Sequence, residues 1–171
     1  MFMDLITKRR SIRRYAKRPV EPEKIERLVE AALRAPSGRD LKPWEFVVVT
    51  DTELIARLSK AKPHGASFLQ NAPLAIAVCV DPQKSDVWVE DAAIATIFLH
   101  LAATDMGLGS CWIQMRLRKN EDGRGAGEHV AGILGLRPGL DVLALVAVGY
   151  PDEQKAPHAK SDLSYDKVSY R

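Results

Sequence analysis

A long hydrophobic stretch between residues 87 and 106 dominates the pattern of apolar and polar positions along the chain. Apolar residues occupy every turn nearly all the way round, which predicts a helix without a wide polar face that is covered on all sides. Four polar residues interrupt the stretch and make it a poor membrane span: Glu90, Asp91, His100 and Asp105. In a chain this short, a helix that is covered on every side usually needs a second copy of the protein to cover it. We therefore expect a homodimer with this helix at its centre, and with Ala95 and Ala102 in buried contacts.

The remaining pattern alternates between helical and strand periodicity. Four segments predict helices: residues 3–9, 20–36, 51–61 and 128–134. Four others predict strands: residues 44–50, 74–80, 110–115 and 141–150. The strand over 74–80 is continuously apolar, so we expect it to be covered on both faces. Residues 151–171 show little periodicity and form an irregular tail that must lie over another surface to be ordered.

Local signals define the ends of the predicted helices. Ser85 or Asp86 is the expected cap of the long apolar helix. Gly107 and Gly109 can take the left-handed conformation that the end of this helix requires. Thr50 is expected to begin a capping box for the helix that follows the first strand.

The composition fits one ordinary globular domain that spans residues 1–171. The chain is 46% hydrophobic and 27% charged, and it contains neither an internal repeat nor a low-complexity tract. Its two cysteines, Cys79 and Cys111, give neither a disulfide framework nor a metal ribbon. The four histidines lack metal-ligand spacing, so no metal site is expected. Because no signal-like segment opens the sequence, we expect a cytoplasmic protein.

Positive charge is concentrated near the N-terminus. Residues 8–18 carry seven cations and no acid, and removing these seven from the overall net charge of +3 leaves −4 for the rest of the chain. Within this segment Arg9 and Arg10 offer forked donors for phosphate oxygens, and Ser11 adds a hydroxyl. Arg13 lies two residues after Ser11, so in an extended segment it can reach further along the same ligand. The pattern indicates an anion site, while a solvated basic arm or a nucleic-acid-binding segment has the same composition.

Two glycine-containing segments can bring backbone close to a ligand. Pro36, Ser37 and Gly38 form a turn that exposes backbone donors and a hydroxyl, although a plain connecting turn has the same pattern. The second segment, GLGSCWIQ, lacks the dinucleotide fingerprint, because it follows a helix and Trp112 stands where the third glycine belongs. The sequence contains no Gly-x-Ser-x-Gly nucleophile elbow, so no motif supports a hydrolase.

Five segments, taken in order, make the chain resemble the nitroreductase family of FMN-dependent oxidoreductases: RRSIRRY, APSGRDLKPWEF, NAP before an apolar strand, EDAAIATIFLHLAATDMGLGSCWIQ, and a terminal strand leading into GYP. The resemblance runs through most of the chain. It implies an α+β fold with a central, mostly antiparallel sheet flanked by helices. It also implies an intertwined homodimer with one FMN at each end of the interface, and a tail over 151–171 that packs on the partner subunit.

The resemblance further implies a cofactor-binding set drawn from both subunits. One subunit would supply the phosphate and ribityl contacts and the cation at the pyrimidine edge: Arg9, Arg10, Ser11 and Arg13. The partner subunit would contribute the turn formed by Pro36, Ser37 and Gly38. The backbone beside the isoalloxazine would come from Trp112, Ile113 and Gln114.

Two parts of the predicted set depart from the family pattern. Asp40 and Lys42 stand where many members carry Asn and Gln, so a cofactor contact from Asp40 would differ from the family's. In the tail, Lys160 is the best match to the family's basic phosphate ligand, with Lys155 and His158 behind it.

A member of this family would transfer hydride from NADH or NADPH through flavin N5 to a nitroaromatic, quinone or similar small-molecule acceptor in a ping-pong cycle. Because the flavin carries the chemistry, no catalytic side chain is expected. A reductive dehalogenase or flavin-modifying relative would share the same cofactor contacts and is the first alternative. A non-enzymatic nucleic-acid-binding module is the second, and it requires residues 8–18 to be free in solution. Neither a nucleic acid nor a membrane is an expected partner of the oxidoreductase.

Overall fold

The computed structural model describes residues 1–171 and is built around a four-stranded sheet. The strands are β1 (Trp44–Val49), β2 (Leu74–Val80), β3 (Gly109–Gln114) and β4 (Asp141–Gly149). They lie in the order β1-β2-β4-β3, and every neighbouring pair is antiparallel. The expected α+β class with a central antiparallel sheet is confirmed, and the sheet is antiparallel throughout.

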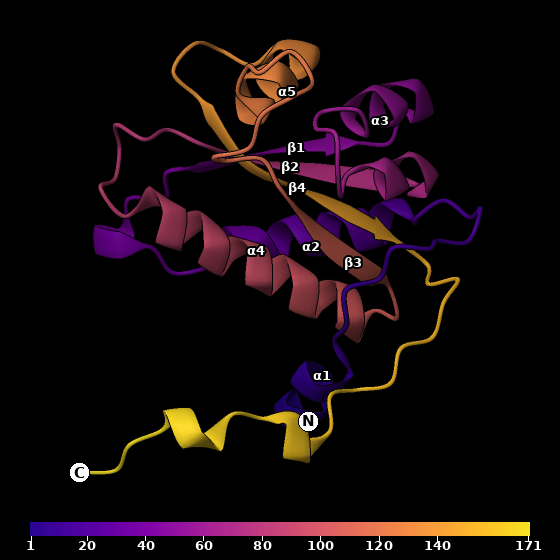
Figure 1. The fold of residues 1–171 in the computed structure, drawn as a ribbon, viewed down its shortest axis with the longest axis vertical. Coiled ribbons are helices and arrows are strands. Elements are labelled where there is room, and N and C mark those ends of the chain that lie inside the picture. Colours follow the sequence, from indigo (N-terminus) through magenta and orange to yellow (C-terminus); the bar gives the residue numbers. More distant parts are fainter.

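The chain forms five α-helices, of which four cover the sheet and α1 packs on α4: α1 (Phe2–Lys8), α2 (Pro22–Leu33), α3 (Thr52–Leu58), α4 (Trp88–Asp105) and α5 (Ala126–Leu134). Helices α2 and α4 cover one face of the sheet, and α3 and α5 cover the other (Figure 1). No helix combines the length and the hydropathy that spanning a bilayer requires.

The central strand β2 explains why the sheet is covered on both sides. All seven of its residues are buried, as the continuous apolar run predicted. Because successive side chains point to opposite faces, Ile76 and Val78 pack toward α2 and α4, while Ala77 and Cys79 pack toward α3 and α5. A strand that is apolar on both faces must lie between two layers, and this requirement fixes the three-layer arrangement.

Several predicted helix ends are wrong in detail. Neither Ser85 nor Asp86 caps α4, whose first flanking residue is Val87 and whose start has no side-chain cap. The Ser85 hydroxyl instead donates to a buried carboxylate further along the helix. Gly107 does take a left-handed conformation, with φ of 73°, but Gly109 does not and begins β3. Asp51 rather than Thr50 caps α3, because its Oδ1 accepts from the Leu54 N–H at 2.7 Å.

The chain itself covers the inner face of helix α4 and, through α1, part of the C-terminal end of the helix. The inner face packs on the sheet and on α2, and Ala95 lies there, fully buried against Ala35 and Trp44. The buried contact expected of Ala95 is therefore confirmed, and it is made within its own chain. The outer face stays apolar, and four of its side chains are exposed: Ala93, Ile94, Ile97 and Phe98. Ile97 is 42% exposed.

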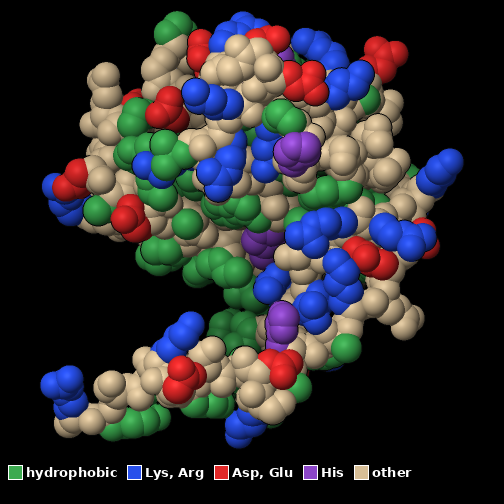
Figure 2. Space-filling view, in the orientation of Figure 1, with side chains coloured by type: hydrophobic (Ala, Val, Ile, Leu, Met, Phe, Trp, Pro, Cys, Tyr) green, Lys and Arg blue, Asp and Glu red, His purple; other side chains and the backbone are tan.

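The tail stays bonded to residues 10–16 as far as Ala156, and every residue from Ala156 onward is exposed. It holds two short 3₁₀ turns, Lys160–Asp162 and Tyr165–Lys167. Its large apolar side chains are at least half exposed: Leu163, Tyr165, Val168 and Tyr170. Figure 2 shows an open hollow between the tail and the body, with hydrophobic side chains on its walls. Packing of this tail on a partner subunit remains a prediction.

Candidate functional site

The basic segment is a docked, extended arm over residues 9–16. Ser11 pairs with Ser110 at the start of β3, and the Ile12 N–H donates to the Ser110 carbonyl at 3.0 Å. At the other end Tyr15 bridges to Pro151. The nucleic-acid alternative needed this segment free in solution, and the structure instead fixes it along its length.

Two apolar side chains hold the arm in place. Ile12 and Tyr15 are 7% and 6% exposed, and the Tyr15 hydroxyl donates to the Ile12 carbonyl at 2.5 Å. Gly109 permits this approach, since a Cβ there would lie 2.7 Å from the Ile12 Cβ. With these anchors turned inward, the arm leaves Arg13 exposed on its outer side.

The cations of the arm differ in what they already contact. Arg9 makes no hydrogen bond or ion pair with its side chain, whereas the Arg10 guanidinium donates to the Ala156 carbonyl. The Arg13 guanidinium lies over the Phe68 ring, 5.8 Å from its centroid. Arg9 and Arg13 therefore retain most of their donors for a ligand, and Phe68 is a neighbour that no sequence pattern indicated.

The tail places one predicted residue beside the arm. The Lys155 ammonium donates to the Ser11 carbonyl at 2.6 Å and lies 3.3 Å from Glu153 Oε1. Lys160 and His158 are exposed and make no such contact. Within one chain, Lys155 is thus the tail cation nearest to the predicted phosphate site, and Lys160 is not brought to it.

His100 is buried in α4 beneath the arm. Its Nδ1 lies 2.7 Å from the Ser110 hydroxyl, so it is the satisfied core histidine that its lack of metal-ligand spacing indicated. Burial, reinforced by the nearby positive charge of Arg9, lowers the pKa of His100 to about 4. The imidazole is therefore neutral at pH 7.

This histidine predicts how stability depends on pH. Because the folded protein disfavours the protonated ring, the unfolded chain binds the proton more readily, and stability should fall as the pH drops from about 6.5 toward about 4. The loss attributable to His100 is roughly 3 kcal/mol at most. Thermal unfolding across this range should show a shallower decline for His100→Gln, while the exposed His64→Gln should keep the wild-type slope.

The Pro36–Gly38 turn is fixed at the opposite end of α4 by a buried carboxylate. Asp91 is 2% exposed, and its Oδ1 accepts from the Gly38 N–H at 2.7 Å. Its Oδ2 accepts from the Ser85 hydroxyl at 2.9 Å. The Ser37 Oγ accepts from the Lys42 N–H at 2.9 Å, so the hydrogen of the Ser37 hydroxyl is still available to a ligand.

The backbone that follows this turn is strained. Arg39, Asp40 and Lys42 all take left-handed conformations, with φ of 53°, 58° and 46°. Each such residue costs about 1 kcal/mol relative to an ordinary conformation. Ion pairs restrain the segment, since Arg39 contacts Asp86 and the Lys42 ammonium lies 3.0 Å from the Asp40 carboxylate. The Asp40 side chain is thus engaged within the turn, and its contact with a cofactor remains a prediction.

One chain does not bring the arm and the turn together. The turn is fixed near Asp91, and the arm lies beside His100 and Ser110 at the other end of the helix (Figure 1). Asp91 and His100 are nine residues apart, which corresponds to about 13 Å along an α-helix. The predicted contacts from Arg9 and Ser37 are therefore separated within a single subunit.

Strand β3 offers its backbone rather than its side chains. The Trp112 Nε1–H donates to Gln114 Oε1 at 2.8 Å, and Gln114 Nε2 donates to the Arg116 carbonyl at 2.9 Å. The Ile113 side chain is buried on the opposite face of the sheet. Because β3 is an edge strand, its outer backbone groups are not paired in the sheet beyond the contact with Ser11.

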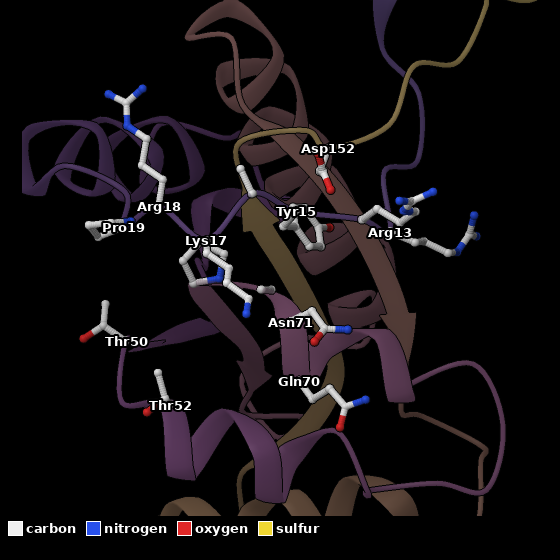
Figure 3. Close-up of a pocket in the computed structure, with 14 residues that line it drawn as sticks. Arg13, Tyr15, Lys17, Arg18, Pro19, Thr50, Thr52, Gln70, Asn71 and Asp152 are labelled. Atoms are coloured by element: carbon white, nitrogen blue, oxygen red, sulfur yellow. The ribbon is translucent and has the colours of Figure 1, made fainter.

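A groove of about 870 Å³ lies on the other side of the arm. Figure 3 shows Lys17 reaching into the space near Thr52 and Asn71, while Arg18 points out of it. Of the predicted site residues, only Arg13 lines this groove. The groove and the predicted cofactor set therefore share only Arg13.

Comparisons with known proteins agree with this arrangement. A model of the nitroreductase family matches residues 6–64 and 60–150. A solved structure from Clostridium difficile R20291, described as an FMN-dependent nitroreductase, superposes with a TM-score of 0.96 at 43% identity, covering 98% of each chain. A protein of Archaeoglobus fulgidus, assigned provisionally as an NADH dehydrogenase/NAD(P)H nitroreductase, is 37% identical over 90% of this chain and 87% of its own.

A further relative, the NADH dehydrogenase of Thermus thermophilus, is 31% identical over 88% of this chain and 86% of its own length. These similarities extend over the sheet, both helical layers and the docked arm. The chain belongs to the nitroreductase family.

Proposed function

We propose that the protein is an FMN-dependent oxidoreductase that takes hydride from NADH or NADPH and reduces nitroaromatic, quinone or similar acceptors. The docked arm carries this proposal, because its fixed backbone holds Ser11 and, two positions before it, an Arg9 guanidinium that makes no hydrogen bond or ion pair. This donor set suits a phosphate monoester. The similar structure from C. difficile, described as FMN-dependent, supports FMN as the molecule that carries it.

The residues present fit FMN along its length. Arg9 and Ser11 would hold the phosphate, with Lys155 behind them, and the exposed Arg13 guanidinium would face the pyrimidine edge. The unpaired edge of β3 would offer backbone groups to the ring. The chemistry that FMN supplies when bound is hydride uptake at N5 from NAD(P)H followed by delivery to the acceptor. The protein's contribution is position and electrostatics, so it needs no proton-transferring side chain.

A homodimer completes this site. The outer face of α4 is apolar and uncovered, and the hollow beneath it is walled by hydrophobic side chains (Figure 2). If two copies pack α4 against α4 about a twofold axis, the start of one helix lies beside the end of the other. That arrangement brings the Ser37 turn of one subunit to the Arg9 arm of its partner, which a single chain cannot do.

Purification tests the proposal directly. The protein should be yellow, should release FMN on denaturation, and should oxidise NADH or NADPH in steady state when a quinone is supplied. Colourless protein that does not take up added FMN would overturn the flavin assignment. Protein that binds FMN, fails to reduce quinones and removes halide from a halogenated phenol would replace the reductase by the dehalogenase alternative.

A further inference from the structure

The first residues of the tail form a strap along the basic arm. The strap is residues 150–156, and its backbone is bonded to the arm at several points. The Ala16 N–H donates to the Tyr150 carbonyl at 2.9 Å, and the Asp152 N–H donates to the Arg14 carbonyl at 2.9 Å. Segments separated by about 140 positions in the sequence are therefore held side by side, as Figure 1 shows for the arm and the chain that follows β4.

One side chain of the strap bonds the backbone of the arm at its centre. Glu153 Oε1 accepts from the Arg13 N–H at 2.5 Å and from the Arg14 N–H at 3.2 Å. The Glu153 side chain is 18% exposed and also pairs with Lys155 at 3.3 Å. Donation from the Arg13 N–H holds the pKa of Glu153 below its ordinary value, so the carboxylate is charged at pH 7.

We propose that Glu153 is a positioning residue for the flavin site. Its carboxylate fixes the backbone at Arg13 and Arg14, and thereby fixes the direction in which the arm presents its donors. The proposal rests on the proposed function, since it takes FMN as the ligand of the arm. Glu153 touches no part of the cofactor in this account and acts through the backbone of the arm.

The physical argument concerns an acid that lies beside a site for an anion. As a charge alone, Glu153 repels a phosphate and weakens its binding. As an acceptor for two consecutive amides, it restricts an extended segment that would otherwise lose conformational entropy when the ligand binds. The two effects have opposite signs, so the direction of the change on removing the charge separates them.

The test compares three variants by titrating FMN into flavin-free protein and following flavin fluorescence. Glu153→Gln keeps the shape of the side chain but replaces a charged acceptor by a weaker neutral one, so FMN should bind roughly three- to tenfold more weakly. Glu153→Ala removes the acceptor, and binding should weaken roughly tenfold or more. Asp152→Asn is the matched control, because it removes the same charge from an exposed neighbour whose side chain makes no bond to the arm. Its FMN affinity should stay within about twofold of wild type or improve.

Amide hydrogen exchange in the flavin-free protein supplies a readout that does not depend on FMN. The Arg13 and Arg14 amides should exchange faster in Glu153→Gln and at the wild-type rate in Asp152→Asn. Tighter FMN binding by Glu153→Gln, or unchanged protection of both amides, would overturn the positioning role. Wild-type protein that binds no FMN, with faster exchange still confined to Glu153→Gln, would overturn the proposed function and leave the bonding of the arm by Glu153 intact.

Discussion

Replacing Ile97 with Glu should abolish the dimer and, with it, FMN binding. Ile97 lies on the uncovered face of α4, where 42% of its surface is exposed in one chain. In a twofold dimer built on this face the substitution places two unpaired carboxylates in an apolar contact, and each costs on the order of several kcal/mol. The proposed site takes residues from both subunits, so the loss of the interface should remove the cofactor as well.

Light scattering after size exclusion gives the mass of each variant, and the absorbance near the flavin band gives its cofactor content. Gly132→Glu is the control, because it adds the same charge to α5 on the other side of the sheet, where a Cβ meets nothing within 4 Å. This variant should remain a yellow dimer. An Ile97→Glu protein that stays dimeric with full FMN content would place the interface elsewhere on the molecule.

Substituting Arg9 and Arg13 should give different losses, although the two residues are four positions apart. Arg9→Ala should weaken FMN binding roughly ten- to a hundredfold, because charge-assisted hydrogen bonds to a phosphate contribute about 1.5–3 kcal/mol each. Arg13→Gln should instead lower the midpoint potential of the bound flavin and slow hydride transfer from NAD(P)H. A cation at the pyrimidine edge favours the more negative reduced form, and about 30 mV corresponds to ~1.4 kcal/mol for a two-electron couple.

Equilibrium FMN titration and a redox titration of each variant separate the two roles. Arg14→Gln is the control, since Arg14 is an exposed cation of the same arm that lines the groove on its other side. Its FMN affinity should stay within about twofold of wild type, and its flavin midpoint potential should not change. An Arg13→Gln protein with unchanged potential and weakened FMN binding would move Arg13 into the phosphate site.

The periodicity of apolar residues predicted most of the helices and strands that the structure contains. The continuous apolar run at 74–80 identified a strand covered on both faces, and the apolar character of 87–106 identified the helix at the centre of the proposed interface. The basic cluster indicated an anion site because its composition is extreme. Its docked conformation did not follow from composition, since Ile12 and Tyr15 anchor it to residues far along the chain.

The residues that hold the site together were missed for the same reason. Glu153 bonds an arm 140 positions earlier, and Asp91 bonds a glycine 53 positions earlier. Asp91 is a polar interruption in an apolar helix, which was a usable signal, because a buried carboxylate needs a partner. Glu153 is one acid in a mixed-charge tail, and no pattern distinguished it from Asp152. The expected cap at Ser85 is wrong because its hydroxyl donates to the Asp91 carboxylate and accepts only from the Val87 N–H, which precedes the helix.

The strained turn at residues 39–42 also limits how this protein can be improved in the laboratory. Asn at Arg39 or Lys42 would relax a left-handed backbone, and relief of that strain should raise the melting temperature. The Arg39 side chain pairs with Asp86 and the Lys42 side chain with Asp40, so replacing either loosens the segment next to Ser37. A thermostability screen applied to this chain alone would therefore favour variants that loosen part of the proposed cofactor site, so each round of selection has to score flavin retention together with heat resistance.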